Sequence, residues 1–178
     1  MDQIIAQIIG YVALLFIILS FQKNKRTTLL LIMLAGLLLF TIHYALLGAW
    51  TGSLANLIEA GVVFIAYKKE TNTWAQKTWW LYLFIGLYII TGVFTTKSWI
   101  DVLPIIAQTF GAIAVWQIKA RRIRFLMLLP RLLWFIYNLT VGSQAGVITE
   151  VLVTVSVLVG IARFDVIPRF SKKKQKVD

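Results

Sequence analysis

Cysteine is absent from this sequence of 178 residues, and histidine occurs once, as His43. The absence of cysteine excludes disulfides, thiolate nucleophiles and cysteine metal sites, while it leaves the compartment open. One histidine with scattered carboxylates does not make a metal site. No serine or threonine stands with a histidine and carboxylate set suited to hydrolysis. The sequence therefore predicts no enzyme, no metal and no cofactor.

Charged residues are also scarce. They make up 14% of the chain, whereas 60% of the residues are hydrophobic, and the mean hydropathy is +0.82. A soluble domain of this length does not carry so much apolar surface, so the composition predicts a polytopic membrane protein. A helical span needs about 20 apolar residues, which leaves room for roughly seven spans on short loops. No length remains for a soluble domain.

Seven apolar segments follow one another, separated by short polar or charged links. They divide the chain into a first three-helix unit (1–69), a linker transmembrane helix (70–97), a second three-helix unit (98–164) and a basic cytoplasmic tail (165–178). The predicted fold is all-α, with seven transmembrane helices in a 3+1+3 order. The predicted spans are about 4–21, 28–47, 53–67, 78–95, 102–118, 125–141 and 145–162.

The net charge of +11 comes from basic residues at the ends of the apolar segments, which is the usual pattern of orientation signals in membrane proteins. This placement argues against nucleic acid as a partner. With the N-terminus outside and the C-terminus inside, only Lys97 falls on the outer side. The cytoplasmic side then receives Lys23, Lys25, Arg26, Lys68, Lys69, Lys77, Lys119, Arg121, Arg122, Arg124 and the six basic residues from Arg163 onward.

Two stretches that lie 94 positions apart correspond without a gap. They are 43–59, HYALLGAWTGSLANLIE, and 137–153, YNLTVGSQAGVITEVLV. Each predicts the end of one span, a tight outer turn from Gly48 to Gly52 or its equivalent, and the start of the next span. Three helices, one linker helix and three helices give both copies the same orientation, so the sequence predicts a parallel repeat about an axis along the membrane normal. The equivalent positions include Gly48/Gly142, Gly52/Gly146 and Asn56/Glu150.

Features along nearly the whole chain carry a resemblance to known proteins. They are His43, Leu46-Leu47-Gly48, Leu103-Pro104, Trp134, Asn138, Gly142-Ser143, Gly146, Glu150 and Arg163-Phe164. On these residues the chain resembles the YgjV-type bacterial inner-membrane proteins, and its 3+1+3 plan is similar to the SWEET/PQ-loop (MtN3-like) superfamily. The resemblance implies a multi-pass protein of the cell inner membrane. SWEET-like proteins place an Asn facing the sugar on the third helix of each repeat; Asn56 fits, but Glu150 stands at the equivalent position, which puts a neutral sugar in doubt.

Three ionisable residues fall inside apolar segments: Glu59, Arg131 and Glu150. Charges at the bilayer centre cost about 2.5–3.5 kcal/mol on insertion scales, so buried ones usually face a bundle interior and function there. Helical spacing places Asn56 beside Glu59 on one helix. On another helix it aligns Arg131 with Trp134 and Asn138. The sequence thus predicts a central substrate pocket. Its expected members are Asn56, Glu59, Arg131, Trp134, Asn138 and Glu150.

A structural explanation stays open for each of these residues. Arg131 can extend to the cytoplasmic face, and the two glutamates can hold neighbouring helices together. His43 and Glu150 are candidates for a proton relay, although a lone histidine near a helix end more often bonds a neighbour.

These features predict a small-solute transporter that works by alternating access, with proton coupling through Glu150 or Glu59 as one possibility. The alternative is a non-transporting membrane scaffold or accessory subunit, in which every buried charge needs a partner. Two glutamates against one arginine leave a surplus carboxylate, which favours transport, and favours a lipid or a cation over a phosphate as the solute. The expected partners are the lipid bilayer and a small solute; neither the identity of this solute nor the oligomeric state follows from the sequence.

Overall fold

The computed structural model describes residues 2–21, 26–69, 71–117 and 120–166, and within these ranges all regular structure is helical. Three short turns of helix, η1 (Thr73–Gln76), η2 (Trp99–Asp101) and η3 (Ala162–Val166), accompany the α-helices. The α-helices are α1 (Asp2–Phe21), α2 (Arg26–Leu46), α3 (Trp50–Lys68), α4 (Trp79–Thr95), α5 (Val102–Val115), α6 (Ala120–Leu126), α7 (Leu128–Thr140) and α8 (Gln144–Ile161).

Four of these helices are long and apolar enough to cross a membrane: α1, α2, α3 and α8. The helices Trp79–Thr95 and Trp99–Ala114 are apolar but shorter. The prediction of an all-α polytopic membrane protein is therefore confirmed. The count of seven spans, the parallel repeat and the orientation stay predictions.

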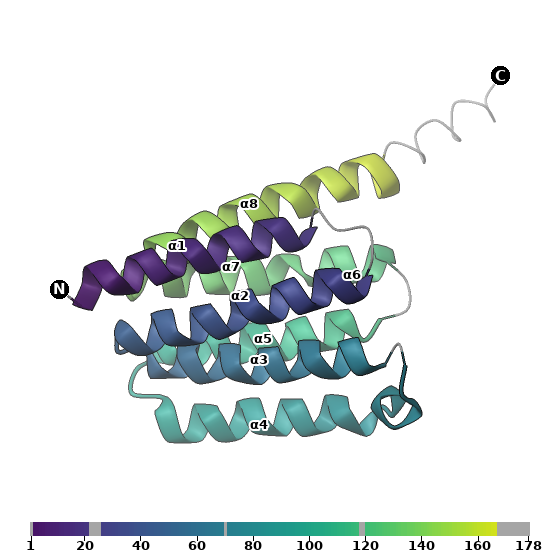
Figure 1. Cartoon of the computed structure of the whole chain (residues 1–178), viewed down its shortest axis with the longest axis horizontal. Helices are drawn as coiled ribbons and strands as arrows, with labels where there is room; N and C mark the ends of the chain where they lie inside the picture. Colours follow the sequence, from purple (N-terminus) through teal and green to yellow (C-terminus); the bar gives the residue numbers. More distant parts are fainter. Residues whose placement is uncertain (1, 22–25, 70, 118–119, 167–178) are drawn as a thin grey trace.

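The helices lie side by side along one direction, and the chain reverses between successive long helices, while α7 follows α6 without a reversal (Figure 1). In the first half, α2 packs against α1 and α3; in the second half, α7 packs against α5 and α8. Two interfaces join the halves, α1 with α8 and α3 with α5, while α4 contacts α3 and α5 at one edge of the bundle.

The predicted sixth span, 125–141, differs from the structure. The chain is already helical from Ala120, it breaks at Met127, and α7 begins at Leu128. Pro130 explains the break, because proline has no N–H for the carbonyl of Leu126 and its ring crowds that turn. The predicted fifth span also ends earlier than expected, at Val115 rather than at Ile118.

The predicted turn from Gly48 to Gly52 is shorter in the structure, since α3 already begins at Trp50. Gly48 and Gly142 carry the turns, with φ angles of 70° and 71°, a region that glycine enters without steric cost. Gly52 and Gly146 lie inside α3 and α8 instead.

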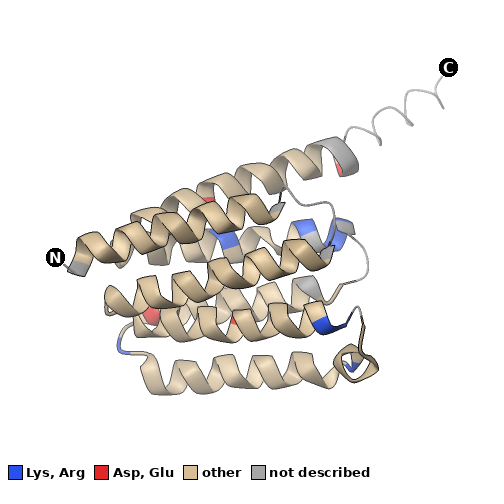
Figure 2. Cartoon of the chain, in the orientation of Figure 1, with Lys and Arg blue, Asp and Glu red and all other residues tan. Residues whose placement is uncertain are grey.

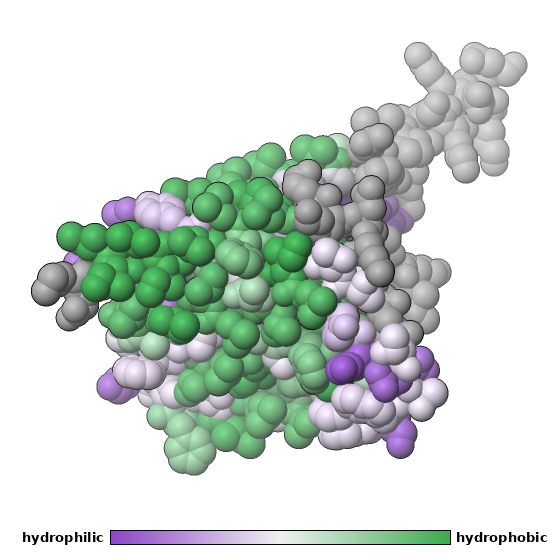
Figure 3. All heavy atoms as spheres, in the orientation of Figure 1, coloured by the Kyte–Doolittle hydropathy of each residue, from purple (hydrophilic) through white to green (hydrophobic). Residues whose placement is uncertain are grey.

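Apolar side chains cover much of the outer face of the bundle (Figure 3). Phe94, Val93 and Ile4 are 83%, 74% and 68% exposed, as suits contact with lipid tails. The described basic residues gather mainly at the end of the bundle where α3 ends and α6 begins (Figure 2). Lys97 follows α4 at the opposite end. Lys23, Lys25, Lys119 and residues 167–178 of the predicted tail lie outside the described residues.

This charge asymmetry predicts the orientation of the chain, because basic loops stay in the cytoplasm. Reporter enzymes fused to chains truncated after Lys69, or to the C-terminus, should report the cytoplasm. Reporters after Gly52 and after Lys97 should report the outer side. A cytoplasmic signal after Gly52 would contradict both the seven-span count and the repeat.

Candidate functional site

A cavity of about 400 Å³ lies between the two halves of the bundle. Its walls come mainly from α2, α3, α7 and α8, with Ile17 of α1 and Gln108 of α5. Along α2 the lining extends from Leu30 to Tyr44, which corresponds to about 21 Å of helix. Most lining side chains are apolar, and a smaller number are polar or charged. This is the usual composition of a small-molecule site.

Equivalent positions of the two halves line this cavity together. In six cases both members of a pair that is 94 residues apart are lining residues. In three of the pairs at least one member is polar or ionisable, and the two members are different residue types. The six pairs are Met33/Met127, Leu37/Arg131, Phe40/Trp134, Asn56/Glu150, Glu59/Val153 and Val63/Val157.

Arg131 and Glu150 form an ion pair on the cavity wall. Nη1 of Arg131 donates a hydrogen bond to Oε1 of Glu150 at 3.3 Å and lies 3.1 Å from Oε2, where the contact is electrostatic only. The side chains are 20% and 8% exposed, so the pair is largely withdrawn from solvent. Nε of Arg131 is buried and has no hydrogen-bond partner among the described residues. A pair so placed is costly to break, because either charge would remain buried alone.

Glu59 has a different kind of partner. The phenol of Tyr88, on the linker helix α4, donates a hydrogen bond of 2.7 Å to Oε2 of Glu59. Tyr88 is fully buried, and no ion pair of Glu59 is present in the described part of the chain. This carboxyl group is thus held by a neutral donor.

Asn56 is buried on the same wall, and its Nδ2 donates to the carbonyl of Gly52 in its own helix at 3.0 Å. Thr149 similarly donates to the carbonyl of Ala145 at 2.8 Å. These bonds to the helix backbone fix both side chains and lower the cost of a polar group in an apolar surrounding.

Three aromatic rings line one end of the cavity: Phe40, Tyr44 and Trp134. The ring centroids of Tyr44 and Trp134 are 5.6 Å apart, and those of Phe40 and Tyr44 are 6.0 Å apart. Such spacings lie in the favourable range for aromatic pairs.

A buried polar layer lies beyond these rings, at the end of the bundle where the Gly48 and Gly142 turns lie. Its members are His43, Tyr44, Tyr137, Asn138 and Ser143. Tyr44 donates to Oδ1 of Asn138 at 2.6 Å, and Tyr137 accepts from the backbone N–H of Gly52 at 3.0 Å. Both bonds join the first half to the second. Because Tyr44 belongs to the polar layer and to the cavity wall, the cavity ends against this layer.

His43 bonds through both ring nitrogens, each at 2.7 Å: Nδ1 to the carbonyl of Ala6 and Nε2 to Oγ of Ser143. A backbone carbonyl only accepts hydrogen bonds, so Nδ1 carries a proton. Ser143 in turn accepts from the N–H of Gly146 at 3.1 Å and caps α8. His43 therefore ties α1 and α2 to the start of α8.

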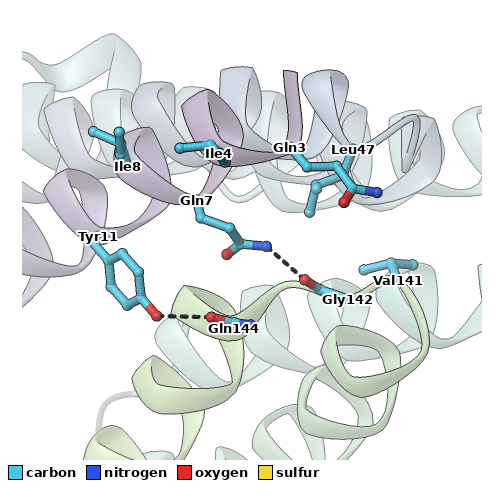
Figure 4. Close-up of a pocket in the computed structure, with 9 residues that line it drawn as sticks. All are labelled: Gln3, Ile4, Gln7, Ile8, Tyr11, Leu47, Val141, Gly142 and Gln144. Atoms are coloured by element: carbon cyan, nitrogen blue, oxygen red, sulfur yellow. Dashed lines mark hydrogen bonds between the residues drawn. The ribbon is translucent and has the colours of Figure 1, made fainter. Parts of the chain in front are cut away.

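A second, shallower groove lies between α1 and the turn before α8 (Figure 4). Its lining includes no charged side chain. Gln7 donates to the carbonyl of Gly142 at 2.7 Å, and Tyr11 donates to Gln144 at 3.2 Å. These two bonds attach α1 to the second half.

The structure brings five of the six predicted pocket residues to the cavity: Asn56, Glu59, Arg131, Trp134 and Glu150. Asn138 and His43 lie in the polar layer, and neither is a lining residue. Their assigned roles stay predictions.

Sequence reasoning missed Phe40, Tyr44 and Tyr88. The first two occupy the positions equivalent to Trp134 and Asn138, so the 94-residue offset contained the signal. Tyr88 stands on the linker helix, which has no counterpart, and nothing in the sequence pairs it with Glu59.

Gly52 lies in close contact with Tyr137 of the other half, and Gly146 lies in close contact with Asn138 and Ser143 of its own half. A methyl group on Gly52 would lie 2.7 Å from the Tyr137 ring, and one on Gly146 would lie 2.5 Å from Oγ of Ser143. Overpacking of this kind costs about 1–3 kcal/mol, so Gly52→Ala and Gly146→Ala should lower the melting temperature in detergent. Gly86→Ala is the control, because a methyl group there meets nothing within 4 Å. Equal melting temperatures for all three variants would contradict the close contact.

A family model, Imp-YgjV, described as bacterial inner membrane protein, matches residues 4–166. No curated protein and no solved structure matches the chain.

Proposed function

The chain belongs to the Imp-YgjV family of bacterial inner membrane proteins, and from this premise we propose that it carries a small solute across the inner membrane by SWEET-like alternating access. In this proposal the two halves rock about the central cavity, and the protein moves its solute unchanged rather than acting as an enzyme. The observation that carries the proposal is the cavity itself, which lies between the halves and contains ionisable groups.

The correspondence between the halves supports a repeat. Helix ends fall 94 residues apart at several points: Phe21 with Val115, Leu46 with Thr140, and Trp50 with Gln144. The contacts correspond as well, because the α1–α8 and α3–α5 interfaces exchange under the same offset. Transporters built from repeats bind their solutes at the repeat interface, where a rocking motion exposes the site to each side in turn.

The cost of the polar groups supports a role in binding. An ionisable side chain in a membrane interior is unfavourable by several kcal/mol unless it is paired or used. The arginine and two glutamates on one wall concentrate this cost at a single place. A cavity beside them gives a solute access to the charges.

The break before α7 supports a moving bundle. Met127 stands at the break and also lines the cavity. A helix interrupted at this point allows α6 to change its angle to α7 with little loss of backbone hydrogen bonding.

A scaffold or accessory subunit is the second candidate, and the Arg131–Glu150 pair favours it. A structural ion pair needs no solute, and this one satisfies two of the three buried charges. Glu59 is the residue that this alternative leaves without a cation.

The test combines ligand response and stability in the same variants. Purified protein is screened by thermal shift against sugars, amino acids, polyamines and vitamins, and any stabilising solute is then tested for uptake into proteoliposomes. A solute at about 100 times its Kd stabilises the protein by about 2.7 kcal/mol, which a melting curve resolves. We expect Glu150→Gln to fold with a moderate fall in melting temperature, since Arg131 loses its counter-charge while glutamine still accepts its hydrogen bond, and to lose solute stabilisation and uptake.

The scaffold alternative predicts the reverse result. Glu150→Gln would then strand Arg131 and lower the melting temperature strongly, and adding Arg131→Leu would restore it. Asp101→Asn serves as the control, because this carboxylate caps η2 and does not line the cavity. A Glu150→Gln protein with unchanged stability and unchanged solute response would contradict both roles.

A further inference from the structure

The charges on the cavity wall do not balance. The lining residues include two carboxyl groups, of Glu59 and Glu150, and one cationic side chain, that of Arg131. Arg131 forms its ion pair with Glu150. Among the described residues, the partner of Glu59 is the phenol of Tyr88. An ionised Glu59 thus leaves the cavity with one surplus negative charge.

This surplus negative charge determines which charge a ligand of the cavity should carry. A carboxylate in an apolar surrounding is poorly solvated, and one phenol hydrogen bond offsets only part of the lost hydration. A cationic ligand would supply the rest, whereas an anion would be repelled by the surplus charge. Arg131 also interacts electrostatically with Glu59, but its ion pair is with Glu150. One cation against two carboxylates still leaves one negative charge, so the preference for a cationic ligand remains.

The walls select the kind of cation. Ca²⁺ and Mg²⁺ require six or more oxygen ligands, but most lining side chains here end in carbon. The aromatic rings of Phe40, Tyr44 and Trp134 favour an organic cation over a metal ion, because the apolar body of such a cation can pack against them. A volume of about 400 Å³ also exceeds what a single ion needs and suits a small organic molecule.

We propose that the solute of this cavity is a monovalent organic cation with an apolar body, whose ammonium group pairs with Glu59. The apolar body contacts the aliphatic and aromatic walls. This inference rests on the proposed function, since it names the class of solute for the same site.

Four probes that share a phenyl ring and differ in their charged groups test the proposal: 2-phenylethylammonium, 2-phenylethanol, phenylacetate and phenylalanine. Titration calorimetry on the full chain in lipid nanodiscs at neutral pH measures their binding. We expect the ammonium to bind about tenfold or more tightly than the neutral alcohol, and phenylacetate to bind weakest. Phenylalanine, whose carboxylate cancels the charge, should bind no better than the alcohol.

Variants then locate the ammonium group. Glu59→Gln keeps an acceptor for the Tyr88 phenol, so the protein should fold with a similar melting temperature. It should lose about tenfold or more in affinity for 2-phenylethylammonium while 2-phenylethanol binds as before. Tyr88→Phe removes the phenol donor and leaves the carboxylate with the ligand as its main partner. It should keep the preference for the cation. Asp101→Asn removes a carboxylate outside the cavity and should change neither affinity.

Several outcomes would overturn the proposal: equal binding of the ammonium and the alcohol, tighter binding of phenylacetate or phenylalanine, no binding of any probe, or an unchanged cation preference in Glu59→Gln. The proposed transport function is tested by a separate result, uptake into proteoliposomes. If the ammonium binds through Glu59 but is not taken up by proteoliposomes, the inference on ligand class stands and transport does not. If another solute is taken up and the ammonium does not bind, transport stands and the ligand class is wrong.

Discussion

The hydrogen bonds that each half gives to the third helix of the other half fix the geometry on which the cavity depends. A helix start leaves backbone N–H groups without partners, and an apolar surrounding makes them costly. The start of α8 has Ser143 as its cap, whereas α3 has Ala49 at the equivalent position and no side-chain cap. Tyr137 compensates from the other half by accepting from Gly52. His43, at the position equivalent to Tyr137, contacts the existing cap Ser143 instead.

These two hydrogen bonds between the halves hold one end of the bundle tightly together, whereas the rest of the interface contains a cavity. The bond from Gly52 to Tyr137 requires α3 to approach the opposite half closely, and glycine at position 52 allows this approach. Gly146 allows α8 to lie close to Asn138 of its own half. Farther along the same helices the facing side chains no longer meet, and the space between Asn56 and Val157 is lined by both halves. The ionisable residues stand in this space, next to the aromatic rings that separate it from the polar layer.

Much of this arrangement follows from the sequence. Hydropathy alone predicts the membrane class, and the polar residues inside the apolar segments predict most of the polar lining that the structure places at one cavity. Three features of the structure could not be predicted from the sequence. The cap exchange depends on side chains that cross between halves, Tyr88 reaches Glu59 from a helix without a counterpart, and the break at Met127 precedes the proline that causes it. Each depends on contacts between distant segments or on local backbone geometry, which hydrophobic periodicity does not encode.

The polar chemistry of the cavity lies where the two halves differ. Two of the six lining pairs, Met33/Met127 and Val63/Val157, are identical and apolar. Leu37 is the residue of the first half that is equivalent to Arg131, and Val153 is the residue of the second half that is equivalent to Glu59. A strictly symmetric site that kept these charged groups would carry two arginines and four glutamates, and the repulsion among the four carboxylates would be unfavourable in an apolar interior. Placing one arginine and two glutamates at non-equivalent positions allows one ion pair to form and leaves the other carboxyl group of the cavity without a cationic partner among the described residues.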